Sequence, residues 1–212
     1  ETSVSFERLM YVENLKQTHF YVDIKRKIEL LSTKKVEANL GVSLNDKLNV
    51  IGYSAKTTMT DVGNKNWTKK AGIISLWELG CMNPTPKTTV VIPLKGEIDE
   101  ATIYFTPIDS TRIKIENNVL FYRADGAYLN KIGTPPENTL SYFGSFSPEL
   151  NVLTIVKFTF NGEVDYVNSV PENAEPYKGD VINVFNDGIW GGLGLLGRFM
   201  SLKPLLQQKH LK

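Results

Sequence analysis

The sequence predicts an all-β fold in which antiparallel sheets pack on one another. Strand-prone runs recur along the chain, turn dipeptides such as Asp125-Gly126 and Asn161-Gly162 join them, and only one short segment has a helical pattern. Many strands with hairpin-type connections are typical of sheet packed on sheet. With 212 residues, the chain is long enough to bury a sizeable core.

The stretch Thr57–Pro93 contains the elements around which we expect the rest of the chain to pack. Gly63 lies among polar residues in a turn after the first strand of this stretch, because glycine reaches positive φ without steric cost. From Gly72 to Leu79 the residues are mostly apolar, which favours a strand covered on both faces. Asn83–Pro86 then excludes helix and strand alike, because proline lacks a backbone donor.

The remaining elements are expected from local patterns. His19–Leu31 alternates between an apolar and a polar face, as a half-buried antiparallel strand does. Thr33–Leu40 has a cap-like start and a glycine stop, so it is the expected helix. The other expected strands are Ser3–Val12, Leu48–Thr60, Ala101–Thr106, Thr111–Ile115, Val119–Arg123 and Val152–Phe160.

Composition narrows the classes of partner. A formal charge of +1 provides no global field to attract nucleic acid, and the cluster Lys25–Lys27 is interpreted as the solvated face of a strand. No apolar run approaches the roughly 20 residues that span a bilayer, so we expect no membrane insertion. The single cysteine, Cys81, lies in an apolar context and is expected to be a buried small hydrophobe. We expect neither a metal nor a cofactor.

Aromatic and amide residues near turns give the functional clue. Sugars present apolar C–H faces and hydroxyl edges, which flat rings, amides and carboxylates match. The candidate carbohydrate-binding residues are Trp77, Glu78, Asn83, Arg123, Lys131, Asn183, Asn186 and Asp187. A purely structural role, with Trp77 in the core and Asp187 in a turn, explains these two residues about as well as sugar binding does. No motif is specific for catalysis.

Several stretches carry a family resemblance, among them NWTKKAGIISLWELGCMNPTPKTTVVIP, VLFYRADGAYLNKIG and GDVINVFNDG. Over about residues 1–197 the chain resembles an uncharacterised family of secreted Bacteroidetes-type proteins, which is similar to the galactose mutarotase-like (aldose 1-epimerase) supersandwich. The resemblance implies a periplasmic or extracellular protein and an antiparallel supersandwich that binds carbohydrate. It also implies that the chain is the C-terminal portion of a larger supersandwich.

The resemblance does not extend to the mutarotase acid and base. Mutarotases use a histidine to protonate the ring oxygen and a glutamate to take the anomeric proton. Their T-x-T-(N/D)-x-G run followed by Gly-x-His is similar to Thr58–Gly63 and Gly72–Ile74, so Ile74 stands where the histidine would fall. We therefore expect no catalytic residue of this type.

The end of the chain departs from the family pattern, in which a glutamate-bearing strand resembles Phe-Tyr-Glu-Leu-Glu-Thr-Ser-Ser-Pro-Ala. A permitted codon choice for residues 199–210, read from the third base, encodes Tyr-Glu-Phe-Glu-Thr-Ser-Ser-Pro-Ala-Glu-Thr. Our hypothesis is that a frameshift produced the sequence from Arg198 onward. We thus expect a β-sandwich domain over residues 1–197 and an aberrant or disordered tail over 198–212.

Three functional hypotheses follow. The first is a carbohydrate-binding protein without the mutarotase acid–base pair. The second is a glycoside-processing enzyme that uses Glu78 and Asp187 as its carboxylate pair. The third is a truncated remnant that forms homodimers through exposed sheet edges.

Overall fold

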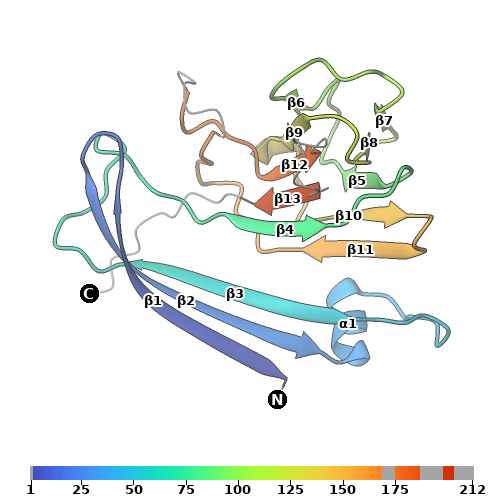
Figure 1. The fold of residues 1–212 in the computed structure, drawn as a ribbon, viewed down its shortest axis with the longest axis horizontal. Coiled ribbons are helices and arrows are strands. Elements are labelled where there is room, and N and C mark those ends of the chain that lie inside the picture. Colours follow the sequence, from blue (N-terminus) through green and yellow to red (C-terminus); the bar gives the residue numbers. More distant parts are fainter. Residues whose placement is uncertain (1, 169–174, 187–197, 203–212) are drawn as a thin grey trace. The chain divides into compact units, whose positions relative to one another are not determined.

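The computed structural model describes residues 2–168, 175–186 and 198–202, the last of these as backbone only. Its contacts divide the chain into two compact units, of which the first contains Glu1–Ile73 and the second Ile74–Gln207 (Figure 1). The expectation of one sandwich domain over residues 1–197 stays a prediction.

The first unit is a three-stranded antiparallel sheet with the order β1-β2-β3. Its strands are β1 (Ser3–Glu13), β2 (His19–Leu31) and β3 (Gly52–Asp61). The alternation expected in β2 is present at its start, where Phe20 and Val22 are both 1% exposed. Trp67 packs edge-on against Phe20, with ring centroids 5.5 Å apart. The apolar face predicted from period-2 alternation is therefore covered at this end of the sheet.

The helix α1 (Thr33–Leu40) has the bounds that the sequence predicts. The side chain of Ser32 caps its first turn by accepting a hydrogen bond from the Lys35 N–H, and Gly41 ends it at φ 71°. Ser32 is a standard start signal, because its side chain accepts a hydrogen bond from a backbone N–H that has no partner within the helix. Gly41 is a standard stop signal, because glycine tolerates the left-handed backbone conformation. No helix in the described part of the chain is long and apolar enough to cross a membrane.

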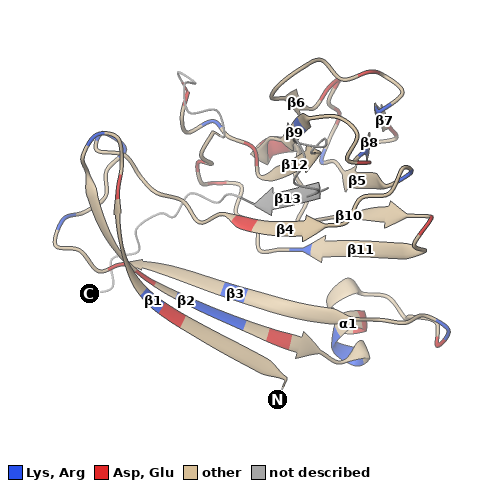
Figure 2. Cartoon of the chain, viewed as in Figure 1, with Lys and Arg blue, Asp and Glu red and all other residues tan. Residues whose placement is uncertain are grey.

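Acidic residues pair with the two lysines of the basic cluster Lys25–Lys27, and residues of both signs lie on this sheet (Figure 2). Lys25 pairs with Glu7 of the neighbouring strand at 2.9 Å, and Lys27 pairs with Glu29 at 3.2 Å. These contacts agree with the interpretation of the cluster as a solvated strand face, because exposed ion pairs of mixed sign leave little net field.

The second unit consists of two five-stranded antiparallel sheets, so the all-β sandwich predicted from the sequence is confirmed. The first sheet has the order β11-β10-β5-β8-β7 and the second the order β4-β13-β12-β9-β6. The strands are β4 (Glu78–Met82), β5 (Thr89–Pro93), β6 (Thr102–Ile103), β7 (Ile113–Glu116), β8 (Val119–Arg123), β9 (Asn130–Thr134), β10 (Tyr142–Ser147), β11 (Val152–Lys157), β12 (Ile182–Asn186) and β13 (Arg198–Leu202), with a short 3₁₀ helix, η1, at Pro136–Asn138.

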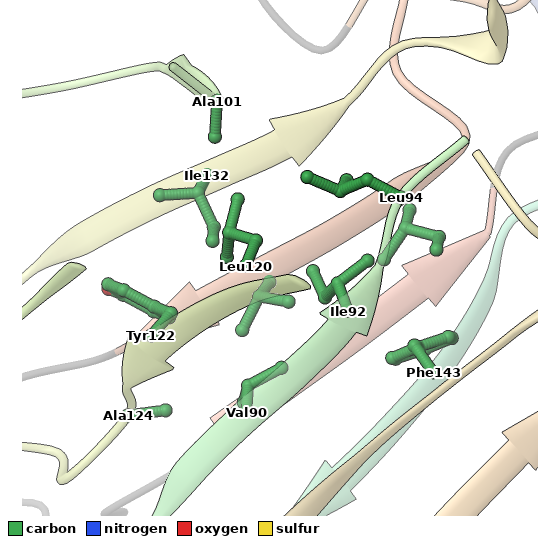
Figure 3. Packing of buried hydrophobic residues seen from close by; sticks show 11 residues of the cluster. Val90, Ile92, Leu94, Ala101, Leu120, Tyr122, Ala124, Ile132 and Phe143 are labelled. Atoms are coloured by element: carbon green, nitrogen blue, oxygen red, sulfur yellow. The ribbon is translucent and has the colours of Figure 1, made fainter. Parts of the chain in front are cut away.

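The hydrophobic core of this unit lies between its two sheets (Figure 3). Ile92 and Leu120 come from one sheet and Ile132 and Val184 from the other, and all four are 0% exposed. Burying each such side chain contributes about 1.5–3 kcal/mol. This double layer fixes the strand ends on which the polar clusters described below are built.

Two expectations for the organising stretch are wrong. The strand expected over Gly72–Leu79 forms only from Glu78, as β4, and Trp77 is 56% exposed and Leu79 46% exposed. The cysteine expected to be buried, Cys81, is exposed. The reason is that β4 is an edge strand with one face toward the core, so alternate residues such as Met82 pack inward while their neighbours face outward.

Residues 198–202 form a strand where the sequence led us to expect an aberrant or disordered tail. Their backbone, as β13, pairs with β12 on one side and β4 on the other. Residues 203–212 lie outside the described part of the chain, and the frameshift hypothesis stays a prediction.

Candidate functional site

The structure does not bring together Glu78 and Asn186, two of the predicted carbohydrate-binding residues. Strand register across β13 places Glu78 in the row of Ile182, whereas Asn186 lies in the row of Met82, at the other end of the sheet. Four residues of strand separate these rows, which is roughly 13 Å. Trp77 directly precedes Glu78 and therefore lies at the same end of the sheet as Glu78. Asp187 falls outside the described residues.

Two other predicted residues, Asn83 and Arg123, are exposed and come from different sheets. Asn83 is exposed and follows β4 at the end of the sheet where Asn186 lies. Arg123 is the last residue of β8 in the opposite sheet, and its side chain is exposed. The backbone N–H of Arg123 donates to the carbonyl of Arg112 at 2.7 Å.

A group of side chains that we call the Tyr128 cluster surrounds Asn186 and consists of Arg112, Asp125, Tyr128 and Asn186. Arg112 donates from Nη2 to Asp125 Oδ1 at 2.5 Å, with both side chains about nine-tenths buried. The guanidinium carbon of Arg112 lies 4.4 Å from the centre of the Tyr128 ring. The Tyr128 side chain remains open, since this residue is 59% exposed. An exposed aromatic ring is thus held against a buried ion pair.

Asn186 holds the loop of the cluster in place. This residue is 0% exposed, and its Oδ1 accepts a hydrogen bond from the Gly126 N–H at 2.7 Å. Its Nδ2 donates to the carbonyl of Tyr128 at 2.9 Å and to Asp125 Oδ1 at 3.4 Å. Gly126 has φ 74°, which is the left-handed conformation that the Asp-Gly turn predicts. The amide therefore fixes the backbone on both sides of Ala127.

The ion pair sets the charge state of Asp125. Burial alone would raise the pKa of the Asp125 carboxyl, but hydrogen bonds from Arg112 and the Ala127 N–H, with the charge of Arg112, outweigh burial. The pKa consequently lies below its ordinary value, because each of these contacts favours the ionised form. Asp125 is a carboxylate at neutral pH.

Two donors beside this pair have no hydrogen-bond partner among the described residues. They are Arg112 Nε and the hydroxyl of Tyr122, and both atoms are buried. Burial also raises the pKa of the Tyr122 hydroxyl far above its ordinary value, so the group stays protonated. This end of the core is therefore polar and holds unused donors.

The two remaining predicted residues, Lys131 and Asn183, lie on the other face of this sheet. They lie on β9 and β12 and, by strand alternation, face away from Asn186. We call the group around them the Asp180 cluster, which consists of Thr102, Tyr104, Lys131, Gly133 and Asp180. Asn183 is 1% exposed and donates from Nδ2 to the carbonyl of Asp180 at 3.1 Å, which is a structural contact.

The comparison with protein families gives one match. A family described as a family of unknown function (DUF6786) matches residues 1–212. The chain belongs to this family. No curated protein and no solved structure matches the chain.

Sequence reasoning missed most of the residues that give this DUF6786 chain its polar clusters. Arg112, Tyr128, Tyr104 and Asp180 were not among the candidates. The Asp125-Gly126 turn and the GDVINVFNDG stretch were the available signals, because one places Tyr128 and the other contains both Asp180 and Asn186. Within the described ranges, no group of three or more His, Cys, Asp or Glu side chains could hold a metal ion.

Proposed function

We propose that this protein binds carbohydrate at the Tyr128 cluster. The observation that carries the proposal is the Tyr128 ring, 59% exposed and backed by the Arg112 guanidinium 4.4 Å from its centre. A ring held flat by a cation behind it offers its free face to the C–H groups of a pyranose at little cost in side-chain entropy.

Polar groups of the cluster supply hydrogen bonds to the edge of a sugar. Asp125 Oδ1 is occupied by Arg112 and by the Ala127 N–H at 3.0 Å, whereas Oδ2 accepts no hydrogen bond from the described residues. A carboxylate whose position is fixed by a buried partner accepts bonds from sugar hydroxyls without reorganising. An exposed ring beside a fixed carboxylate is the combination that sugar binding needs.

The supersandwich type and the mutarotase-like relationship belong to this proposal as well. The two five-stranded antiparallel sheets are compatible with them, and the sequence resemblance to mutarotase-like proteins is the reason to expect a sugar ligand. The carboxylate pair of Glu78 and Asp187 stays a prediction, because Asp187 lies outside the described residues.

A glycan array followed by calorimetry with the best hit tests the proposal. Tyr128→Ala should weaken binding about tenfold, because the stacked ring contributes on the order of 1 kcal/mol beyond its buried area. Tyr53→Ala is the matched control, since Tyr53 is 65% exposed in the first unit and should have no effect. Equal affinities of Tyr128→Ala and the unaltered protein, or no bound glycan on a broad array, would overturn the proposal.

A further inference from the structure

The Asp180 cluster contains a buried carboxylate for which the backbone leaves space. Asp180 is 3% exposed, and its Oδ2 lies where a side chain on Gly133 would begin, since a Cβ built on Gly133 would come within 2.1 Å of that oxygen. The strand β9 therefore accommodates the carboxyl group only because residue 133 is a glycine.

Hydroxyl groups, and no cation, are hydrogen-bonded to this carboxylate in the described part of the chain. Tyr104 donates its hydroxyl proton to Oδ2, and Thr102 donates to Oδ1 at 3.1 Å. Burial raises the pKa of Asp180 above its ordinary value, and the two hydroxyl donors with the charge of Lys131 offset only part of that rise. A carboxylate in this state is a stronger base than an exposed aspartate.

The positive charge of Lys131 lies over the ring of Tyr104. Its Nζ is 4.2 Å from the ring centroid. Because a phenolate spreads its negative charge into the ring, an ammonium in this position stabilises the deprotonated tyrosine more than the neutral one. Tyr104 itself is half-buried, so it connects the buried carboxylate with the surface.

We propose that Tyr104 is an activated nucleophile for acyl transfer, with Asp180 as its base and Lys131 as the group that stabilises the developing phenolate. Tyr104 Oη attacks the carbonyl carbon of an ester, and its proton passes to Asp180 Oδ2. The bond between the carbonyl carbon and the leaving alkoxide or phenolate breaks, and an acyl-tyrosine remains. The pattern is that of a hydroxyl activated by an adjacent base.

The first unit provides an internal comparison. Tyr11 also donates its hydroxyl to a carboxylate, Glu13 Oε2, at 2.9 Å. This pair is exposed, and its second polar neighbour is His19 and not a lysine. If contact with a carboxylate were sufficient for activation, Tyr11 and Tyr104 would react alike.

Acetylation by p-nitrophenyl acetate, mapped by peptide mass spectrometry over time, tests the proposal on the full chain. We expect Tyr104 to be acetylated at least about tenfold faster than Tyr11, and Asp180→Asn to slow Tyr104 about a hundredfold, the size of a general-base contribution. Lys131→Met should slow it about tenfold while leaving Tyr11 unchanged. Tyr104→Phe should remove the acetyl group from this peptide altogether.

The pH dependence distinguishes activation from mere exposure. The rate at Tyr104 should level off above the pKa of Asp180. The rate at Tyr11 should continue to rise toward the Tyr11 pKa, which desolvation and the neighbouring Glu13 hold above the ordinary tyrosine value. If Asp180→Asn does not fold, the Lys131→Met rate and this pH profile still decide the question. A Tyr104 rate equal to that of Tyr11, or one that follows the same pH profile, would overturn the proposal. Either result leaves sugar binding at Tyr128 untouched.

Discussion

Asp125 and Asp180 are both largely buried in the second unit, yet their carboxyl pKa values shift in opposite directions. Arg112 lies 2.5 Å from Asp125, and the pKa of Asp125 is lowered. Asp180 contacts the hydroxyls of Tyr104 and Thr102, and its pKa is raised. Burial opposes ionisation in both cases, so a cation within hydrogen-bond distance is what reverses the sign. The first cluster therefore favours the ionised form of its carboxyl group, and the second favours the protonated form.

Removing the cation from the first cluster should give the largest effect. Arg112→Met leaves the Asp125 carboxylate buried without its partner, and we expect a loss of about 3–5 kcal/mol in the free energy of unfolding. Urea unfolding followed by circular dichroism measures it. Lys114→Met is the control, because Lys114 and Glu116 form an exposed pair whose removal should change stability little. Equal losses in the two variants would contradict the assignment.

Filling the space beside the second carboxylate should have the next largest effect. In Gly133→Ala the new methyl group collides with Asp180 Oδ2, and overpacking of this kind costs about 1–3 kcal/mol. Gly162→Ala is the matched variant, since its Cβ meets only the Phe160 ring, at 3.4 Å. Thermal unfolding of both variants should separate them. A Gly133→Ala protein as stable as Gly162→Ala would mean that the carboxylate does not occupy this position.

The two carboxylates should also contribute to stability in different pH windows. Because the folded pKa of Asp180 is raised, folding takes up a proton, and stability increases as pH falls from above that pKa toward the ordinary value of 3.8. Because the folded pKa of Asp125 is lowered, its contribution is present above 3.8 and is lost as pH falls through the folded value.

Urea midpoints measured between about pH 3 and pH 8 check this difference. Asp180→Asn should abolish the increase in stability that accompanies acidification between the folded Asp180 pKa and 3.8. The loss of stability below 3.8, which comes from Asp125, should remain. The charged neighbours of Asp180 are Lys131, which favours ionisation, and Glu137, which opposes it. If the urea midpoint of the unaltered protein falls as pH is lowered from 8 toward 3.8, the pKa of Asp180 is not raised.

The smallest effect is expected at the exposed ring of the first cluster. Tyr128→Leu keeps much of the apolar area but removes the ring above Arg112, which costs about 0.5–1 kcal/mol at an exposed site. Thermal unfolding beside the unaltered protein is the measurement. A loss as large as that of Arg112→Met would show that Tyr128 belongs to the core.

Local signals predicted the elements that depend on local chemistry. The strand His19–Leu31 and the helix Thr33–Leu40 have the predicted bounds, because apolar alternation and helix caps depend only on residues that are close in sequence. The strands β9, β10 and β12 were missed. In β9 and β12, Gly133 and Asn186 interrupt the apolar pattern because they belong to the two clusters, whose other members come from distant segments.

The polar clusters could be predicted only in part for the same reason. Asn186 and Lys131 were candidates because amides and cations near turns suggest binding. Their contacts come from other segments, since Asn186 bonds to Asp125 and Lys131 lies over Tyr104, and a local pattern does not say which distant strands pair.

The position of β13 has a consequence for how the protein is made. Residues 78–82 pair with 198–202 and not with a neighbour synthesised at a similar time. During translation, β4 therefore waits for more than a hundred further residues to leave the ribosome before its hydrogen bonds can form. Until then the nascent sheet has an open flank, at which a chaperone or a second nascent chain can bind.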